Sequence, residues 1–151
     1  MVMVQQKEII STINGLIETL KDGQEGFKQA AEAVKDANMK SLFLEYSQQR
    51  ARFAGELQAE ARQLGESDPE TSSSATGAMH RAWINLKSAV TSGNDHSILA
   101  ECERGEDSAV SEYKDALENG LSSPIRAIVS RQFSEIKSAH DRVKQLRDSA
   151  K

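Results

Sequence analysis

Apolar residues recur every three or four positions over the first part of the chain. Within residues 5–20 they are Ile9, Ile10, Ile13, Leu16, Ile17 and Leu20. This spacing predicts an amphipathic helix, because residues three and four apart share one helical face. A compatible pattern resumes over residues 27–34, so we expect the helix to continue through a weak point at Gly23 and Gly26. Two shorter helices explain the same pattern equally well.

A second amphipathic helix is predicted from about Ala37 to Leu64. Asp36 has a side chain that caps helix N-termini, and Gly65 suits the C-cap because glycine tolerates left-handed backbone. The inner face of this helix carries Met39, Phe43, Tyr46, Arg50, Phe53, Leu57 and Leu64.

The connection that follows, residues 66–77, is polar and rich in Ser and Thr. It is too long for a tight hairpin, and it predicts a crossover after which the next long helix runs in the same direction as the second. A short amphipathic helix is expected over residues 79–90, with Trp83 as a core anchor and a stop at Ser92-Gly93-Asn94.

Two more long helices complete the pattern. One begins near Asp95 and ends at about Asn119, before Gly120, and its inner face carries Ile98, Leu99, Cys102, Glu106, Val110, Tyr113 and Leu117. The last opens at Pro124, where the missing N–H costs little, and its inner face carries Ile125, Ile128, Val129, Phe133, Ile136, His140, Val143 and Leu146. The sequence therefore predicts an all-α four-helix bundle with one extra short helix.

Composition supports one domain over residues 1–151, rich in helix-forming residues and with only two prolines. The net charge is −4 with both signs interspersed, so no basic surface predicts a nucleic-acid partner. No stretch reaches the roughly 18 apolar residues of a membrane span. The single cysteine, Cys102, reads as a small buried hydrophobe and predicts a reducing, cytoplasmic location.

Glu106 and His140 are the polar residues that interrupt the inner faces of the last two long helices. Buried polar groups need partners, so these two are the raw material either of a carboxylate-histidine metal site or of an ordinary buried hydrogen bond.

Three motifs bear on the choice between a metal site and a buried hydrogen bond. They are His80-Arg-Ala-Trp, Glu103-Arg-Gly-Glu-Asp107 and Ala139-His-Asp-Arg. Together they resemble an uncharacterised bacterial four-helix-bundle family within the ferritin-like superfamily, and the resemblance covers almost the whole chain. It implies a ferritin-like antiparallel four-helix bundle with a long crossover between the second and third helices.

The ferritin-like plan uses one Glu from each of two helices and a Glu-x-x-His motif from each of the other two. The resemblance implies Glu25 for the first helix, Glu106 for the third and His140 for the fourth. The remaining positions depart from the plan, because Arg50 and Phe53 stand in place of the second-helix Glu and His. Three residues before His140, the expected Glu is replaced by Lys137.

Replacing two bridging carboxylates by cations repels a metal ion and neutralises the carboxylates that remain. We therefore expect the central metal site to be degenerate. In its place we predict a buried polar network that fixes helix register, formed by Glu25, Arg50, Glu106, Lys137 and His140.

One metal hypothesis survives. Glu103 is three residues before Glu106 and four before Asp107 on one helix, so the three carboxylates can converge with His80 or His140 on a single Fe, Mn or Zn ion. The alternative is that Glu103 and Asp107 are solvated or form ion pairs with Arg104, Arg81 or Arg142.

No Ser or Cys stands beside a His, and no glycine-rich phosphate loop is present, so no catalytic residue is predicted. We expect a non-catalytic cytoplasmic protein without a cofactor, acting through self-association or a protein partner, with a homodimer as the default oligomer. The competing hypothesis is a metal-binding or redox protein that uses the inward acidic and histidine side chains.

Overall fold

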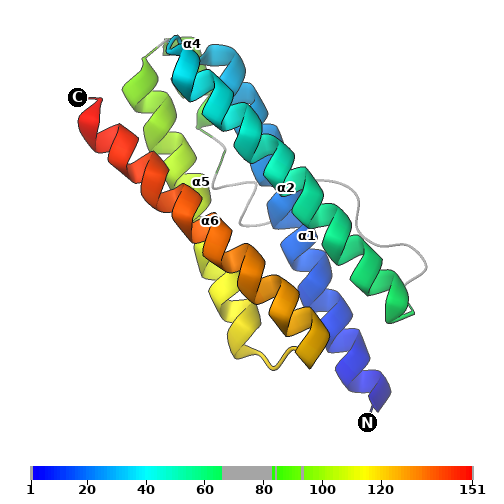
Figure 1. Ribbon diagram of the computed structural model, residues 1–151. Coiled ribbons are helices and arrows are strands. Elements are labelled where there is room, and N and C mark those ends of the chain that lie inside the picture. Colours follow the sequence, from blue (N-terminus) through cyan, green and yellow to red (C-terminus); the bar gives the residue numbers. More distant parts are fainter. Residues whose placement is uncertain (1, 66–82, 84, 93, 151) are drawn as a thin grey trace.

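The computed structural model describes residues 2–65, 83, 85–92 and 94–150 (Figure 1). All regular structure within these residues is helical, so the prediction of an all-α chain is confirmed. The helices are α1 (Val2–Ala33), α2 (Ala37–Gln63), α4 (Leu86–Ser92), α5 (Asp95–Glu118) and α6 (Ser123–Ser149). No helix in the described part of the chain is long and apolar enough to cross a membrane.

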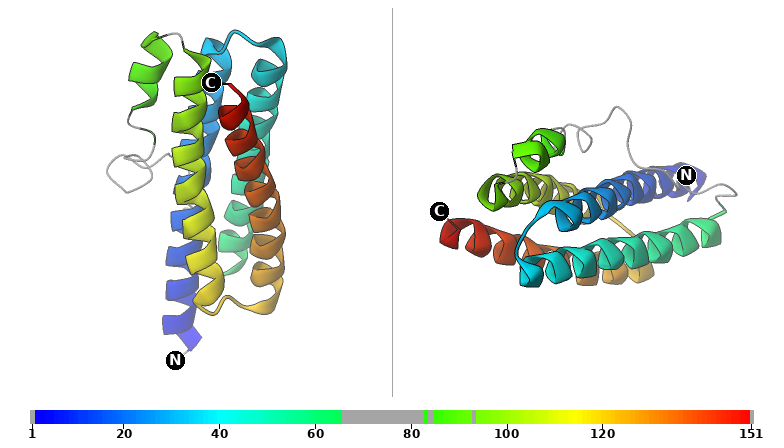
Figure 2. Two further views of the ribbon diagram at one scale, coloured as in Figure 1. Left: turned by 90° about the vertical axis from the view of Figure 1, so that its left-hand side faces the viewer. Right: turned by 90° about the horizontal axis from the view of Figure 1, so that it is seen from above.

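The four long helices lie side by side as a bundle (Figures 1 and 2). Helix α1 packs against α2 and α5, and α6 packs against α5 and α2, so α2 and α5 are diagonally opposite each other. Helices α2 and α5 run in the same direction, and α1 and α6 run the opposite way (Figures 1 and 2). This is the direction that the predicted crossover requires, although residues 66–77 themselves lie outside the described residues.

The extra short helix is α4, which packs against α5 and α1. It ends at Ser92, as predicted, but its described part begins only at Leu86. The start of the predicted segment, residues 79–82, lies outside the described residues. Trp83 precedes α4 and is 9% exposed, so it is a core anchor as expected.

Helix α1 continues unbroken through Gly23 and Gly26, so the alternative of two short helices is wrong. Both glycines are buried and make room for large side chains from other elements. A Cβ at Gly23 would lie 3.3 Å from Nη1 of Arg50, and one at Gly26 would overlap the Trp83 ring. Glycine here permits close packing, and the helix retains its backbone hydrogen bonds.

Helix ends follow the predicted capping residues. Asp36 Oδ1 accepts hydrogen bonds from the backbone N–H of Asn38 at 2.8 Å and of Met39 at 3.0 Å. At the other end of α2, Gly65 has a φ of +102°, a left-handed conformation that favours glycine. Ser122 is the N-cap of α6, but its side chain makes no capping hydrogen bond.

These two N-caps form a matched pair for mutagenesis. We expect Asp36→Ala to lower the free energy of unfolding by about 1 kcal/mol, because two backbone donors lose their acceptor. Ser122→Ala should change it by only a few tenths of a kcal/mol, since no side-chain bond is lost there. Urea denaturation of both variants measures the difference, and equal losses would contradict the capping assignment.

The core consists of two apolar clusters separated by a polar level. Phe53, Leu57 and Tyr113 belong to one cluster, and Phe27, Phe43, Leu99 and Cys102 belong to the other. Arg50 and Glu106 fall between the clusters in the sequence of α2 and α5, and both are buried. The bundle therefore places one charged layer in the middle of its hydrophobic core.

Candidate functional site

Arg50 and Glu106 form an ion pair at the centre of the bundle, which we call the central ion pair. Arg50 Nη1 donates to Glu106 Oε1 at 2.5 Å, and Nη2 donates to Oε2 at 2.7 Å. The two side chains are 1% and 0% exposed. Because α2 and α5 lie diagonally opposite, this bidentate pair joins two helices that do not pack directly on each other.

The remaining surroundings of Arg50 suit a guanidinium group. Its Nε donates to the side-chain oxygen of Gln49 at 3.2 Å, and its Cζ lies 5.2 Å from the centroid of the Phe27 ring. Burial lowers the pKa of Arg50, but the charge and hydrogen bonds of Glu106 raise this pKa by more than burial lowers it. The net shift is therefore upward. Arg50 is therefore protonated and supplies a fixed positive charge beside Glu106.

The prediction that Glu25, Lys137 and His140 belong to the buried network is wrong. Glu25 is exposed and accepts a hydrogen bond from its neighbour Gln29 at 3.1 Å. Lys137 is 55% exposed and lies 3.9 Å from Asp141. His140 is partly buried, and its ring bonds to Asp107 and Asp141, with no hydrogen bond to Glu106.

Helical geometry explains these corrections. The buried positions of α6 near its centre are Gln132, Ile136, Ala139 and Val143. Lys137 and His140 each follow a buried residue by one position, which turns them about 100° away from the core. On α1 the buried positions in this region include Gly23, Gly26, Phe27 and Ala30, and Glu25 precedes Gly26 by one position, which likewise turns it away from the core.

A second polar network, absent from the predictions, adjoins the apolar cluster that contains Phe53 and Tyr113. Tyr113 donates its hydroxyl to Gln132 Oε1 at 2.7 Å. The amide of Gln132 then donates to Glu56 Oε1 at 2.8 Å and to the Phe53 carbonyl at 3.3 Å. Burial raises the pKa of Tyr113, so this hydroxyl stays protonated as a donor. The network links α5, α6 and α2.

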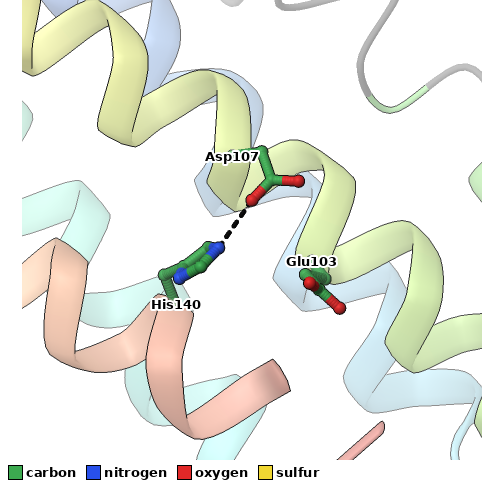
Figure 3. A group of neighbouring side chains, drawn as sticks. All are labelled: Glu103, Asp107 and His140. Carbon is green, nitrogen blue, oxygen red and sulfur yellow. Dashed lines mark hydrogen bonds and ion pairs between the residues drawn. The ribbon is translucent and has the colours of Figure 1, made fainter.

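The acidic and histidine residues predicted as metal ligands are only partly brought together. Glu103, Asp107 and His140 converge between α5 and α6, with one potential ligand atom from each within 4.8 Å of the others (Figure 3). We call this group the edge cluster. Glu106 is not part of it, because both of its oxygens bind Arg50. His80 lies outside the described residues.

Two further residues contact the edge cluster, and neither was predicted as part of a site. Arg147 Nη1 lies 2.5 Å from Glu103 Oε1, and Asp141 Oδ1 lies 3.0 Å from His140 Nδ1. His140 Nε2 lies 2.5 Å from Asp107 Oδ1. His140 and Arg147 are seven residues apart and therefore lie on the same face of α6. This spacing is the feature of the sequence from which the position of Arg147 could have been predicted.

The charges of the edge cluster shift its ionisation. Burial lowers the pKa of His140, but hydrogen bonds with Asp141 and Asp107 raise it by more, so the net shift is upward. The hydrogen bond to His140 lowers the pKa of Asp141. The cluster is thus organised to hold positive charge between carboxylates.

Cys102 provides no separate redox chemistry. It is fully buried in the apolar cluster around Phe27, and burial raises the pKa of its thiol well above the usual range. A thiol in such surroundings is inert and packs as a small hydrophobe, as predicted.

Comparison with known proteins adds the family. No curated protein matches the chain. One family model matches residues 8–119, from the first turns of α1 to the end of α5, which is well over half of the chain. The protein therefore belongs to the family described as a domain of unknown function, DUF2383.

Proposed function

We propose that this protein is a non-catalytic bundle of ferritin-like plan, in which an ion pair stands where a dinuclear metal site would be. It acts in the cytoplasm by self-association or by binding another protein. The observation that carries the proposal is the buried, bidentate contact between Arg50 and Glu106.

The ferritin-like plan is supported by the order and direction of the long helices. Helices α2 and α5 run in the same direction on diagonal corners of the bundle, as in bundles with one long crossover. Glu106 on α5 occupies the position that the resemblance assigns to a metal-binding carboxylate. Its partner, Arg50 on α2, occupies the position of a second carboxylate.

This substitution disfavours a cation at the centre on electrostatic grounds. Both oxygens of Glu106 already bind the guanidinium, and Arg50 keeps its charge throughout the accessible pH range. A metal ion at this place would have to displace Arg50 and leave a buried cation without its partner, which costs several kcal/mol. Glu25, the other carboxylate of the plan, is exposed on α1.

A bundle that does no chemistry at its centre acts through its surface. Self-association is the simplest form, and a two-fold dimer is the commonest closed arrangement. Leu44, on α2, is 43% exposed and is a large apolar side chain available for such a contact. The buried Cys102 fits a reducing compartment, where it needs no disulfide partner.

Aerobic oxidation of Fe²⁺ tests the loss of metal catalysis. We expect the wild-type chain to leave the oxidation rate at that of buffer, and Glu106→Gln to do the same, because Glu106 is not available as a ligand. A rate enhancement that disappears in Glu106→Gln would overturn the proposal. Sedimentation velocity tests self-association, with a dimer expected, and a monomer at every concentration would contradict it.

A further inference from the structure

We propose that Glu103, Asp107 and His140 form a mononuclear site for a transition-metal dication of the Zn²⁺ type. The site lies at the edge of the bundle between α5 and α6 and is distinct from the central ion pair (Figure 3). It does not depend on the function proposed above, because it shares no residue with the Arg50 and Glu106 contact.

The ligand set comes from two elements that pack on each other. Glu103 and Asp107 are four residues apart on α5, so their carboxylates lie on one face, one turn apart. His140 faces them from α6, and Nε2 lies 2.5 Å from Asp107 Oδ1. One imidazole and two carboxylates are a ligand set that first-row dications bind and that leaves a position for water.

The distances require only side-chain adjustment. Ligand atoms about 2.1 Å from a tetrahedral ion lie roughly 3.4 Å from one another. In the structure the three ligand atoms lie within 4.8 Å of one another. The widest separation therefore has to shorten by at most about 1.4 Å, and the shortest has to open by about 1 Å, a range that side-chain rotations can cover.

The orientation of His140 favours metal binding. Nδ1 lies 3.0 Å from Asp141 Oδ1, so Asp141 can accept a proton held on Nδ1. The lone pair of Nε2 then faces Glu103 and Asp107. A carboxylate behind the distal nitrogen is the usual support of a metal-binding histidine, because it fixes the ring and makes it a better donor.

Arg147 is the competitor for this position. It contacts Glu103 at 2.5 Å and so neutralises a carboxylate that is only 8% exposed. Arg147 Nη2 also donates to Asp148 at 2.9 Å, which gives the guanidinium an alternative partner when a metal ion takes Glu103. Removing Arg147 is therefore expected to strengthen metal binding, the opposite of removing a ligand.

Titration calorimetry of the full chain with Zn²⁺ tests the site. We expect one ion per chain and at least a tenfold loss of affinity in each of Glu103→Gln, Asp107→Asn and His140→Ala. Arg147→Gln should bind several-fold more tightly. His96→Ala is the matched control, because it removes an imidazole outside the cluster and should leave the affinity unchanged.

Zn²⁺ should also raise the urea midpoint of the wild type and of His96→Ala but not that of His140→Ala, since a ligand stabilises the state that binds it. Circular dichroism checks that each variant is folded, and Asp107→Asn provides a second test if His140→Ala does not fold. Equal Zn²⁺ affinity in the wild type, His140→Ala and Asp107→Asn would overturn the proposal, as would the absence of saturable binding.

Discussion

Replacing Glu106 with alanine is expected to lower the free energy of unfolding by about 3–5 kcal/mol. The substitution leaves the guanidinium of Arg50 in a site where it is 1% exposed and where Glu106 supplies two of its hydrogen bonds. The penalty arises from a buried charge without a counterion and from the cavity that the lost side chain leaves. Urea denaturation followed by circular dichroism measures it.

A double substitution separates the charge effect from the cavity. Arg50→Met with Glu106→Leu replaces the pair by apolar side chains of similar volume, and we expect stability within about 1–2 kcal/mol of the wild type or above it. Glu106→Gln keeps the shape of the side chain and should fall between these variants. A near-neutral Glu106→Ala would contradict the buried pair, because it would mean that Arg50 reaches water.

The second large effect is expected at Gly105, where alanine should destabilise the protein by about 1–3 kcal/mol. Alanine within a helix normally adds roughly 0.5–1 kcal/mol of stability relative to glycine. Here a Cβ would overlap the Trp83 ring, which is wedged between Gly105 on α5 and Gly26 on α1. Packing strain therefore reverses the usual sign.

Gly55 is the matched control for this prediction. It lies inside α2, it is exposed, and a Cβ built on it meets nothing within 4 Å. Gly55→Ala should therefore stabilise the protein by roughly 0.5–1 kcal/mol. In a Trp83→Leu background the penalty of Gly105→Ala should disappear, because the smaller leucine side chain leaves room for the added methyl group. A stabilising Gly105→Ala in the wild type would show that Trp83 does not pack there.

The helices themselves could be predicted because their signals are local. Apolar spacing locates the long helices, and the capping residues Asp36 and Gly65 locate the two ends of α2. The roles of Gly26 and Gly105 could not be read in the same way. A glycine inside a helical pattern signals either a weak point or a close approach, and only the position of Trp83 decides between them.

The positions of the buried polar residues could not be predicted from local apolar spacing alone. The apolar pattern puts His140 on the inner face because the partly buried Phe133 and Leu146 widen the apolar face of α6. The true buried face is narrower and excludes Lys137 and His140. Arg50 and Glu106 are 56 residues apart, so no local pattern joins them. They were grouped because the resemblance assigned both to metal-ligand positions.

The central ion pair and the edge cluster differ in how far their charged side chains are buried. At the centre, where Glu106 is fully buried, its charge is balanced by a permanent cation from the same chain. At the edge, Asp107 is 61% exposed and stays accessible to an ion from solution, whereas Glu103 is buried and pairs with the half-buried Arg147. The degree of burial therefore distinguishes the structural ion pair at the centre from the candidate metal site at the edge.

Anomalous diffraction from crystals grown with Mn²⁺ or Zn²⁺ shows whether the centre of the bundle holds an ion pair or a metal ion. We predict that Arg50 and Glu106 keep their bidentate contact and that no anomalous peak lies within coordination distance of Glu106. A metal ion bound by Glu106, with Arg50 displaced from it, would show that the centre of the bundle is a metal site and not a structural ion pair.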